Sequence, residues 1–364
     1  MPTEDAVRIA LSISSRPGRP AAEMATYRGV QVAIEELQTD DRLPVDVELV
    51  VYDDEGDTDT TEAFAREIVD DRSVVGVVGP MGSTEALTNA PVFAEAGLAQ
   101  ISPCASHQDL CHPDNETFFR LIASEVVQGR ELSRIAGEYF GAERVSLLRA
   151  DSAWAGALAE NFTEAFETRG GTVTPDTRFP TGATSFEESQ LDTMLEPVVA
   201  ADPDLVFFLV HNENHGVPLS SGLRARGVDV PFLGANALEK GIGGGADGEE
   251  VYQVHPGADF DHFDGAREFR EAYAAQYPPD SAYSPEAYDA VTLFGEALRR
   301  ADEPTRRGVL EALAGLEGFE GASGHISFGA TGERTETPVS LYRVHRTEDG
   351  RETEYLGRTT ELLD

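Results

Sequence analysis

Lysine is almost absent from this chain of 364 residues: Lys240 is the only one among the 28 Lys plus Arg. Asp and Glu together number 66, which gives a formal net charge of −38 at pH 7. The acidic residues are spread along the whole chain, so a disordered acidic tail does not account for them. Because such a chain repels phosphates, the composition excludes nucleic acid as a partner. We interpret the charge as a solvated surface adapted to high salt, with a surface for cations or basic partners as the alternative.

Long apolar runs are also missing. No stretch reaches the length of a membrane span. The first residues, MPTEDAVRIALSIS, have neither the basic start nor the apolar core of a cleavable export signal. Residues 7–13 predict a first strand instead. We therefore expect either a cytoplasmic protein or the exported part of a chain whose signal has been removed, located at the cell surface or in the periplasm.

Cysteine occurs only twice, as Cys104 and Cys111. The two could close a small disulfide in an oxidising compartment or remain partly buried thiols, and their spacing leaves both possibilities open. His107 and His112 lie beside them in the sequence, but the spacing of the four side chains differs from that of standard zinc motifs. We expect no metal and no cofactor here.

The common catalytic motifs are missing as well. No G-x-S-x-G elbow occurs, and the nearest sequence, Gly79-Pro80-Met81-Gly82-Ser83, has the wrong spacing. There is no H-E-x-x-H, no Walker motif and no G-x-G-x-x-G following a strand. These absences favour a protein that binds a molecule without transforming it, and we expect no enzymatic activity.

What the sequence does contain is a regular alternation of strands and helices. A chain of this length is too long for one typical core and suggests two α/β domains. Short connections between alternating elements predict parallel, doubly wound sheets with right-handed crossovers. The expected strands include 7–13, 45–52, 144–148 and 205–209, the expected helices include 24–37, 60–71, 126–139, 155–169 and 285–300, and residues 325–355 are expected to form a hairpin-like tail.

The most informative stretch is VVGVVGPMGSTEALTNAPVFAEAGLAQISPCAS, residues 74–106. It predicts a buried strand, a Gly-rich loop, a helix over 86–96 capped by Ser83 or Thr84, and a second strand over 98–101. The second strand also ends in small polar residues. Ligands of open α/β sheets bind at the carboxyl ends of the strands, and a helix N-terminus there favours an anion. We therefore expect a site for a small molecule.

Several phrases of the sequence, taken in order, resemble one family. They are GPMGSTEALTNAPVFAEAGLAQISPCAS, FFRLIASEVVQGRELSRIA, RADSAWAGALAENFTEAF, RGVDVPFLGANAL, SPEAYDAVTLFGEAL and FEGASGHISFGATGERT. Across nearly its whole length the chain resembles the type I periplasmic-binding-protein fold, specifically the branched-chain-amino-acid-type substrate-binding proteins of ABC importers.

The resemblance implies two α/β lobes, each with a doubly wound parallel sheet, joined by three crossover segments with a ligand cleft between them. Lobe one would comprise residues 1–121 and 254–329, and lobe two residues 122–253 and 330–364. It further implies lobe closure on the ligand, recognition by an ABC permease in the membrane, and a monomer. A ligand-sensing regulator or receptor domain on the same fold is the alternative function.

The resemblance also assigns ligand-binding residues. Ser83 and Thr84 would donate to a ligand carboxylate, although a Ser near a helix start is often only a cap. A ligand ammonium group would be bound by a backbone carbonyl and a hydroxyl of the segment Cys104, Ala105 and Ser106. Three further residues complete the expected site. Trp154 would be an aromatic lid in a loop, His211 a ligand contact directly after a strand, and Tyr283 part of a hydrophobic wall.

One position departs from the family pattern. Asn236 stands where relatives carry an acid that pairs with the ligand ammonium. A neutral amide loses the charge-assisted half of that pairing, although Asp151, Glu213 or Glu239 could replace the missing acid. We therefore hypothesise a small anionic or amide-bearing ligand, with a plain aliphatic amino acid as the alternative.

Overall fold

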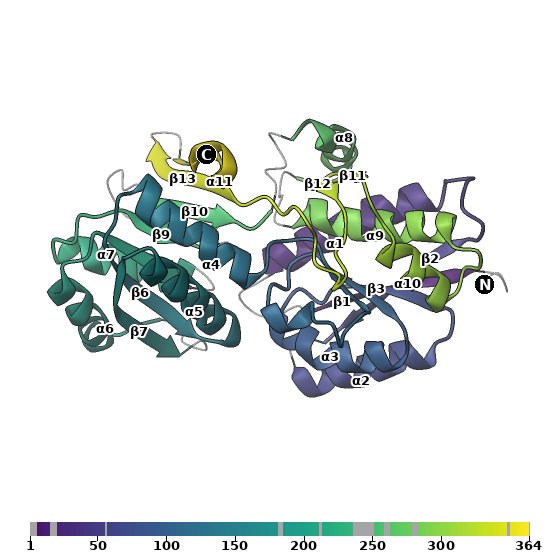
Figure 1. Cartoon of the computed structure of the whole chain (residues 1–364), viewed down its shortest axis with the longest axis horizontal. Helices are drawn as coiled ribbons and strands as arrows, with labels where there is room; N and C mark the ends of the chain where they lie inside the picture. The colour runs from purple at the N-terminus through teal and green to yellow at the C-terminus, as the bar shows by residue number, and fades with distance from the viewer. Residues whose placement is uncertain are drawn as a thin grey trace. The chain divides into compact units, whose positions relative to one another are not determined.

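The computed structural model describes residues 6–14, 20–54, 57–180, 185–210, 213–235, 251–257, 263–278, 283–347 and 350–363. It divides into two compact units. Unit 1 comprises Met1–Ile122 and Asp259–Thr337, and unit 2 comprises Ala123–Ala258 and Pro338–Asp364, so the chain passes from one unit to the other three times. Both units are α/β, which confirms the predicted fold class (Figure 1).

Unit 1 is built on a sheet of five parallel strands in the order β2-β1-β3-β4-β5. The central strand β3 has the sequence VVGVV and is buried along its whole length, as expected of a parallel strand covered on both faces. Val78 at its end lies beside Ile101 of β4, so these two strands finish at the same edge. The strands are β1 (Val7–Ile13), β2 (Val47–Asp53), β3 (Val74–Val78), β4 (Ala99–Ser102) and β5 (Phe118–Arg120).

Helices cover both faces of this sheet (Figure 1). On one face α1 (Pro20–Leu37), α9 (Ser284–Arg300) and α10 (Arg306–Ala314) share a core with the strands. On the other face α2 (Thr58–Asp70) and α3 (Ser83–Glu95) form a second core. The smaller elements are the 3₁₀ turns Gln108–Leu110 and Asp264–Ala266, helix α8 (Arg267–Gln276), and the hairpin β11 (Phe319–Gly321) and β12 (Gly324–Ile326).

Unit 2 contains a seven-stranded sheet in the order β14-β13-β10-β9-β8-β6-β7. Its strands are parallel except at one edge, where β13 and β14 form an antiparallel hairpin. The strands are β6 (Arg144–Asp151), β7 (Thr172–Pro180), β8 (Leu205–Leu209), β9 (Phe232–Gly234), β10 (Val251–His255), β13 (Ser340–Thr347) and β14 (Gly350–Arg358).

Two groups of helices pack against this second sheet. Helix α4 (Glu125–Arg134), the π-helical turn Ile135–Tyr139 and α5 (Ala153–Thr168) share one core with it. Helices α6 (Glu188–Ala201) and α7 (Glu213–Ala225) form the other core, and α11 (Thr359–Leu363) ends the chain. Among all the helices within the described ranges, none combines the length and the apolar character needed to cross a membrane.

The C-terminal part differs from the sequence expectation. Residues 325–355 do not form one hairpin-like tail. The hairpin β11–β12 lies in unit 1, and β13–β14 is a separate hairpin that extends the sheet of unit 2. The residues between them, including Glu333 and Arg334, are held by hydrogen bonds to other parts of unit 1. Alternating apolar residues signal strands but do not say which sheet those strands join.

One buried arginine ties two helices of unit 1 together. Arg306, at the start of α10, donates hydrogen bonds to the carbonyls of Ile68 and Val69 near the end of α2, and to those of Asp71 and Val74 beyond it. The last carbonyls of a helix lack partners within the helix, and a cation there is favourable. The guanidinium therefore acts as a C-terminal cap for α2.

We expect Arg306→Met to lower the free energy of unfolding by about 2–3 kcal/mol, because several charge-assisted hydrogen bonds are lost together. Urea unfolding followed by circular dichroism measures this effect. The matched control is Arg307→Met at the next residue, whose ion pair with Glu311 is largely exposed, so no measurable change is expected. Equal losses for the two variants would contradict the capping role.

Candidate functional site

The loops that follow β3 and β4 are joined by hydrogen bonds. The Gly79 N–H donates to the Ile101 carbonyl at 2.9 Å, and the Gln100 amide nitrogen donates to the Gly79 carbonyl at 2.8 Å. The Ser102 hydroxyl donates to the Pro80 carbonyl at 2.8 Å. The structure thus brings together the two polar strand ends that the sequence predicts to be neighbours.

Four successive backbone N–H groups of the second loop point to two serine hydroxyls. Those of Cys104 and Ala105 donate to Ser102 Oγ, at 3.4 and 2.9 Å. Those of Ser106 and His107 donate to Ser83 Oγ, each at 3.3 Å. The N–H groups of the whole segment 104–107 are therefore directed inward, toward the two serine side chains.

The direction of these N–H groups also fixes the direction of the carbonyls. In a trans peptide group the C=O and the following N–H point opposite ways. The cis peptide bonds of the described chain lie elsewhere, at Gly79–Pro80 and Thr174–Pro175. The carbonyls of Cys104 and Ala105 therefore point away from Ser102 and Ser83. Of these two residues, Cys104 is partly exposed and Ala105 is fully buried, so the Cys104 carbonyl is the acceptor that this geometry turns away from the serines on a partly exposed residue.

Ser83 is not the cap of α3, contrary to the sequence expectation. The helix begins at Ser83, three residues before the expected start, and its N-cap is Gly82, which has no side chain to cap with. The Ser83 hydroxyl instead accepts two N–H groups from the loop after β4, so its own hydrogen remains as the one group it can donate. Thr84, the next residue, is exposed.

Sequence reasoning missed Glu85 in the first turn of α3. This side chain is 3% exposed, and a Cβ added to Gly82 would lie 1.9 Å from its Oε2. A carboxyl group thus lies at the N-terminal end of the helix. Gly82 at the N-cap does not complete the Ser/Thr-x-x-Glu pattern of a capping box, so the spacing of three residues gives no clear signal in the sequence.

Tyr283 lies against both loops. It forms a buried cluster with Ala25, Met81 and Ile122, and Cys104 packs at the edge of this cluster. Its φ of 57° is in the left-handed region, which is costly for an aromatic residue and is often found at functional sites. Met81 is held in place by the Thr26 hydroxyl, which lies 2.9 Å from its sulfur. The predicted apolar wall is thus in contact with the predicted polar loops.

The far end of the second loop is held by a buried arginine. Arg120 at the end of β5 donates to the His107 carbonyl at 2.8 Å and forms an ion pair with Glu333. Burial raises the pKa of the Cys111 thiol well above its usual range. Of the two possibilities left open by the sequence, the structure has free thiols at Cys104 and Cys111.

The histidines of this loop face their own backbone. His107 Nδ1 accepts the Asp109 N–H, and His112 Nδ1 accepts the Asp114 N–H, each at 3.3 Å. Within the part of the chain that the structure describes, no group of three or more His, Cys, Asp or Glu side chains could hold a metal ion.

The other predicted site residues belong to unit 2 or fall outside the described ranges. Trp154 is not in a loop: it lies in the first turn of α5, after the N-cap Ser152, and packs partly buried against the core of unit 2. The Ser152 hydroxyl starts the helix earlier than the apolar pattern indicates. Asp151 is exposed at the end of β6. His211, Asn236 and Glu239 lie outside the described residues.

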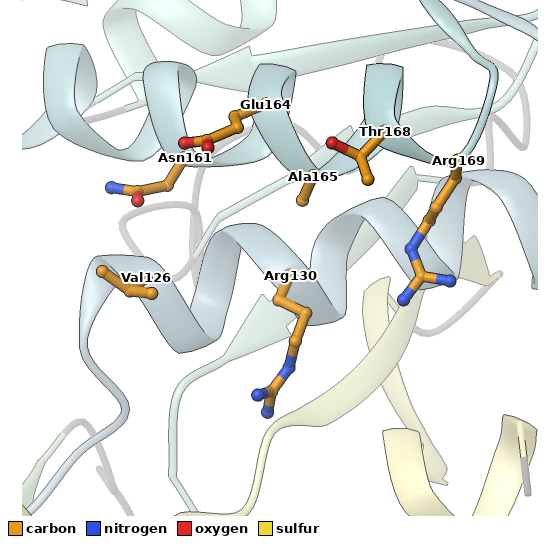
Figure 2. A pocket seen from close by; sticks show the side chains of 7 residues that line it. All are labelled: Val126, Arg130, Asn161, Glu164, Ala165, Thr168 and Arg169. Atoms are coloured by element: carbon orange, nitrogen blue, oxygen red, sulfur yellow. The ribbon is translucent and has the colours of Figure 1, made fainter.

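A groove on unit 2 contains none of the predicted site residues (Figure 2). Its volume is about 500 Å³, and it is lined by residues of α4 and α5 together with Arg169. The two guanidinium groups of the groove already have carboxylate partners: Arg130 pairs with Glu131 and Arg169 with Glu138. The polar strand ends of unit 1 therefore remain the better candidate site.

The protein has two compact α/β units, which are connected by three passages of the chain. Unit 1 carries polar loops at the carboxyl ends of its parallel strands. This is the architecture of a two-lobed solute-binding protein. The chain belongs to the family described as periplasmic binding protein, which matches residues 7–351. Its relatives are substrate-binding proteins of ABC transporters.

Three comparisons illustrate this relationship. The leucine-, isoleucine-, valine-, threonine- and alanine-binding protein of Pseudomonas aeruginosa is 24% identical over 353 residues, covering 94% of this chain and 91% of its own. The structure of LivJ from Streptococcus pneumoniae in complex with isoleucine has a TM-score of 0.80 at 22% identity, covering 97% of this chain and 99% of its own. The R. palustris solute-binding protein in complex with benzoate has a TM-score of 0.80 at 18% identity, covering 97% and 96%.

Proposed function

We propose that this protein is the extracytoplasmic receptor of an ABC importer and binds an amino-acid-like or amide-bearing ligand without transforming it. The observation that carries the ligand class is the orientation of segment 104–107, whose N–H groups are all directed to serine hydroxyls. The Cys104 carbonyl, which points away from those hydroxyls on a partly exposed residue, suits a ligand group that donates hydrogen bonds, such as an ammonium or an amide N–H. A plain carboxylate has no hydrogen to offer there.

In this proposal, the Ser83 hydroxyl donates a hydrogen bond to the acceptor end of the ligand. Because both lone pairs of its Oγ are engaged by N–H groups, its hydroxyl can only donate, and a ligand carboxylate or carbonyl is the matching group. Thr84, exposed beside it, adds a second hydroxyl. Tyr283 supplies apolar surface. The proposed ligand-binding set is that of the sequence analysis: Ser83, Thr84, Cys104, Ala105, Ser106, Trp154, His211, Asn236 and Tyr283.

The remaining parts of the proposal concern the lobes and partners. We propose that units 1 and 2 act as the two lobes expected from the sequence, there placed at residues 1–121 with 254–329 and 122–253 with 330–364, and that these lobes close on the ligand. We further propose a monomer that docks to a membrane permease. Nucleic acid is not a proposed partner because of the net charge of −38. A ligand-sensing receptor domain on the same fold is the competing function. A neighbouring permease and ATPase gene pair would favour import, and an attached signalling module would favour sensing.

A thermal-shift panel at molar salt tests the ligand class. It contains leucine, isoleucine, leucinamide, isocaproate (leucine without its ammonium group) and benzoate, the ligand of the R. palustris structure. We expect stabilisation by leucine, isoleucine or leucinamide, amounting to about 2.7 kcal/mol at a hundredfold excess over Kd. Isocaproate and benzoate should stabilise the protein much less. Equal stabilisation by leucine and isocaproate would overturn the donor-end assignment.

A further inference from the structure

Ser102 is a fully buried serine at the end of β4, with an exposed fraction of 0%. Its hydroxyl donates to the Pro80 carbonyl and accepts the N–H groups of Cys104 and Ala105. One donor and two acceptor positions are all that a serine hydroxyl has. The small polar residues at the end of this strand are expected from the sequence to belong to a ligand site, but the Ser102 hydroxyl is used entirely within the protein.

The three bonds of this hydroxyl join both loops of the candidate site. Pro80 belongs to the loop between β3 and α3, whereas Cys104 and Ala105 belong to the loop after β4. The bond to the Ala105 N–H, at 2.9 Å, also fixes the peptide group that contains the Cys104 carbonyl. Loss of this bond removes one of the contacts that fix the direction of the Cys104 carbonyl.

We propose that Ser102 is a positioning residue that determines how well the site distinguishes ligands with an amino group from ligands without one. It touches no ligand itself. It acts by aiming the Cys104 carbonyl, the group assigned to the ligand's donor end, and by fixing the distance between the two loops. This inference rests on the proposed function for its ligand readout, and on the hydrogen bonds of the ligand-free protein for its structural readout.

The variants are Ser102→Ala, which removes the hydroxyl, and Ser102→Cys, which keeps the shape of the side chain with a much weaker acceptor. Ser102→Thr keeps the hydroxyl and is the conservative rescue. The matched control is Ser146→Ala in β6 of unit 2. Ser146 is also 0% exposed, and its hydroxyl also donates to a carbonyl, that of Thr174 at 2.8 Å.

The first readout is residue-resolved amide hydrogen exchange in the protein without ligand. We expect Ser102→Ala to speed the exchange of the Cys104 and Ala105 amides at least about tenfold. The amides of Ser106 and His107, which are bound to Ser83, should change less. Ser146→Ala should leave all four amides unchanged. Unaltered exchange at Cys104 and Ala105 in Ser102→Ala, or in Ser102→Cys if the alanine variant does not fold, would overturn the proposal.

The second readout is the ratio of dissociation constants for leucine and isocaproate. We expect Ser102→Ala to weaken leucine binding about tenfold and isocaproate binding at most about twofold, with Ser102→Thr restoring the wild-type ratio. General destabilisation would weaken both ligands equally, and that result would overturn the role in discrimination. If the wild-type protein binds neither probe, the proposed amino-acid-like ligand fails, and the exchange measurement still decides whether Ser102 orients the loop.

Discussion

Replacing Gly79 by alanine is expected to lower the free energy of unfolding by about 4 kcal/mol and to abolish ligand binding. Gly79 follows β3 directly and has a φ of 91°. A Cβ at this position would lie 2.3 Å from the Ser12 carbonyl oxygen on the neighbouring strand. Strand β1 would have to move away from β3, and the Gly79 bonds to Ile101 and Gln100 would be disturbed with it.

Gly97→Ala is the matched control for this substitution. Gly97 also has a positive φ, of 59°, but an added Cβ would have nothing within 4 Å. It should cost only about 1 kcal/mol, the conformational strain alone. Urea unfolding followed by circular dichroism compares the two variants. The single tryptophan, Trp154, lies in unit 2, so its fluorescence reports that unit separately. Equal losses in the two variants would show that the contact with Ser12 is unimportant.

Transfer from molar to low salt is expected to destabilise the protein strongly. The net charge of −38 makes the folded chain repel itself, and the screening length grows from about 3 Å in 1 M salt to about 10 Å in 0.1 M salt. We expect a loss of about 5 kcal/mol. For lobes of about 150–250 residues, such a loss lowers the midpoint of thermal unfolding by about 10–20 °C.

A nonionic solute separates screening from general solvent effects. Differential scanning calorimetry in NaCl should show the full dependence. Sucrose at the same osmolality stabilises by exclusion from the protein surface without screening charge. The part of the NaCl effect that sucrose does not reproduce is therefore the part due to screening. The screening length falls from about 10 Å at about 0.1 M salt to about 3 Å at about 1 M. A midpoint that stays constant between about 0.1 and about 2 M NaCl would contradict the interpretation of the acidic composition as an adaptation to salt.

The fold class was predictable because both sheets depend on strong local signals. Continuous apolar runs such as VVGVV and LVFFL predict buried parallel strands, and the strands β3 and β8 lie where these runs occur. Strand β5, with the sequence FFR, was not predicted. It has only three residues, and its end is fixed by an ion pair between Arg120 and the distant Glu333. No pattern within so short a segment reports a partner of that kind.

The sequence predicted that the loops after β3 and β4 are neighbours, but it did not predict the hydrogen bonds between them. The sequence indicates that Ser83 and Ser102 lie at neighbouring strand ends, and the structure places them there. It does not indicate that both hydroxyls accept the N–H groups of segment 104–107, because the direction of a hydroxyl depends on tertiary contacts. Trp154 was placed in a loop because the cap at Ser152 was not recognised. Glu85 was missed because Gly82, three residues before it, does not match the Ser/Thr-x-x-Glu pattern of a capping box.

The order of the two units along the chain has a consequence for synthesis. The core of unit 1 combines α1, from the segment Met1–Ile122, with α9 and α10, from the segment Asp259–Thr337. Between these two segments lies Ala123–Ala258 of unit 2. A ribosome needs roughly 7–30 s to make a stretch of about 140 residues. During that interval the first 122 residues lack α9 and α10, two of the three helices that cover one face of their sheet. The segment Met1–Ile122 is thus the part of the nascent chain that leaves apolar surface uncovered for longest, and the part that a chaperone would have to protect longest.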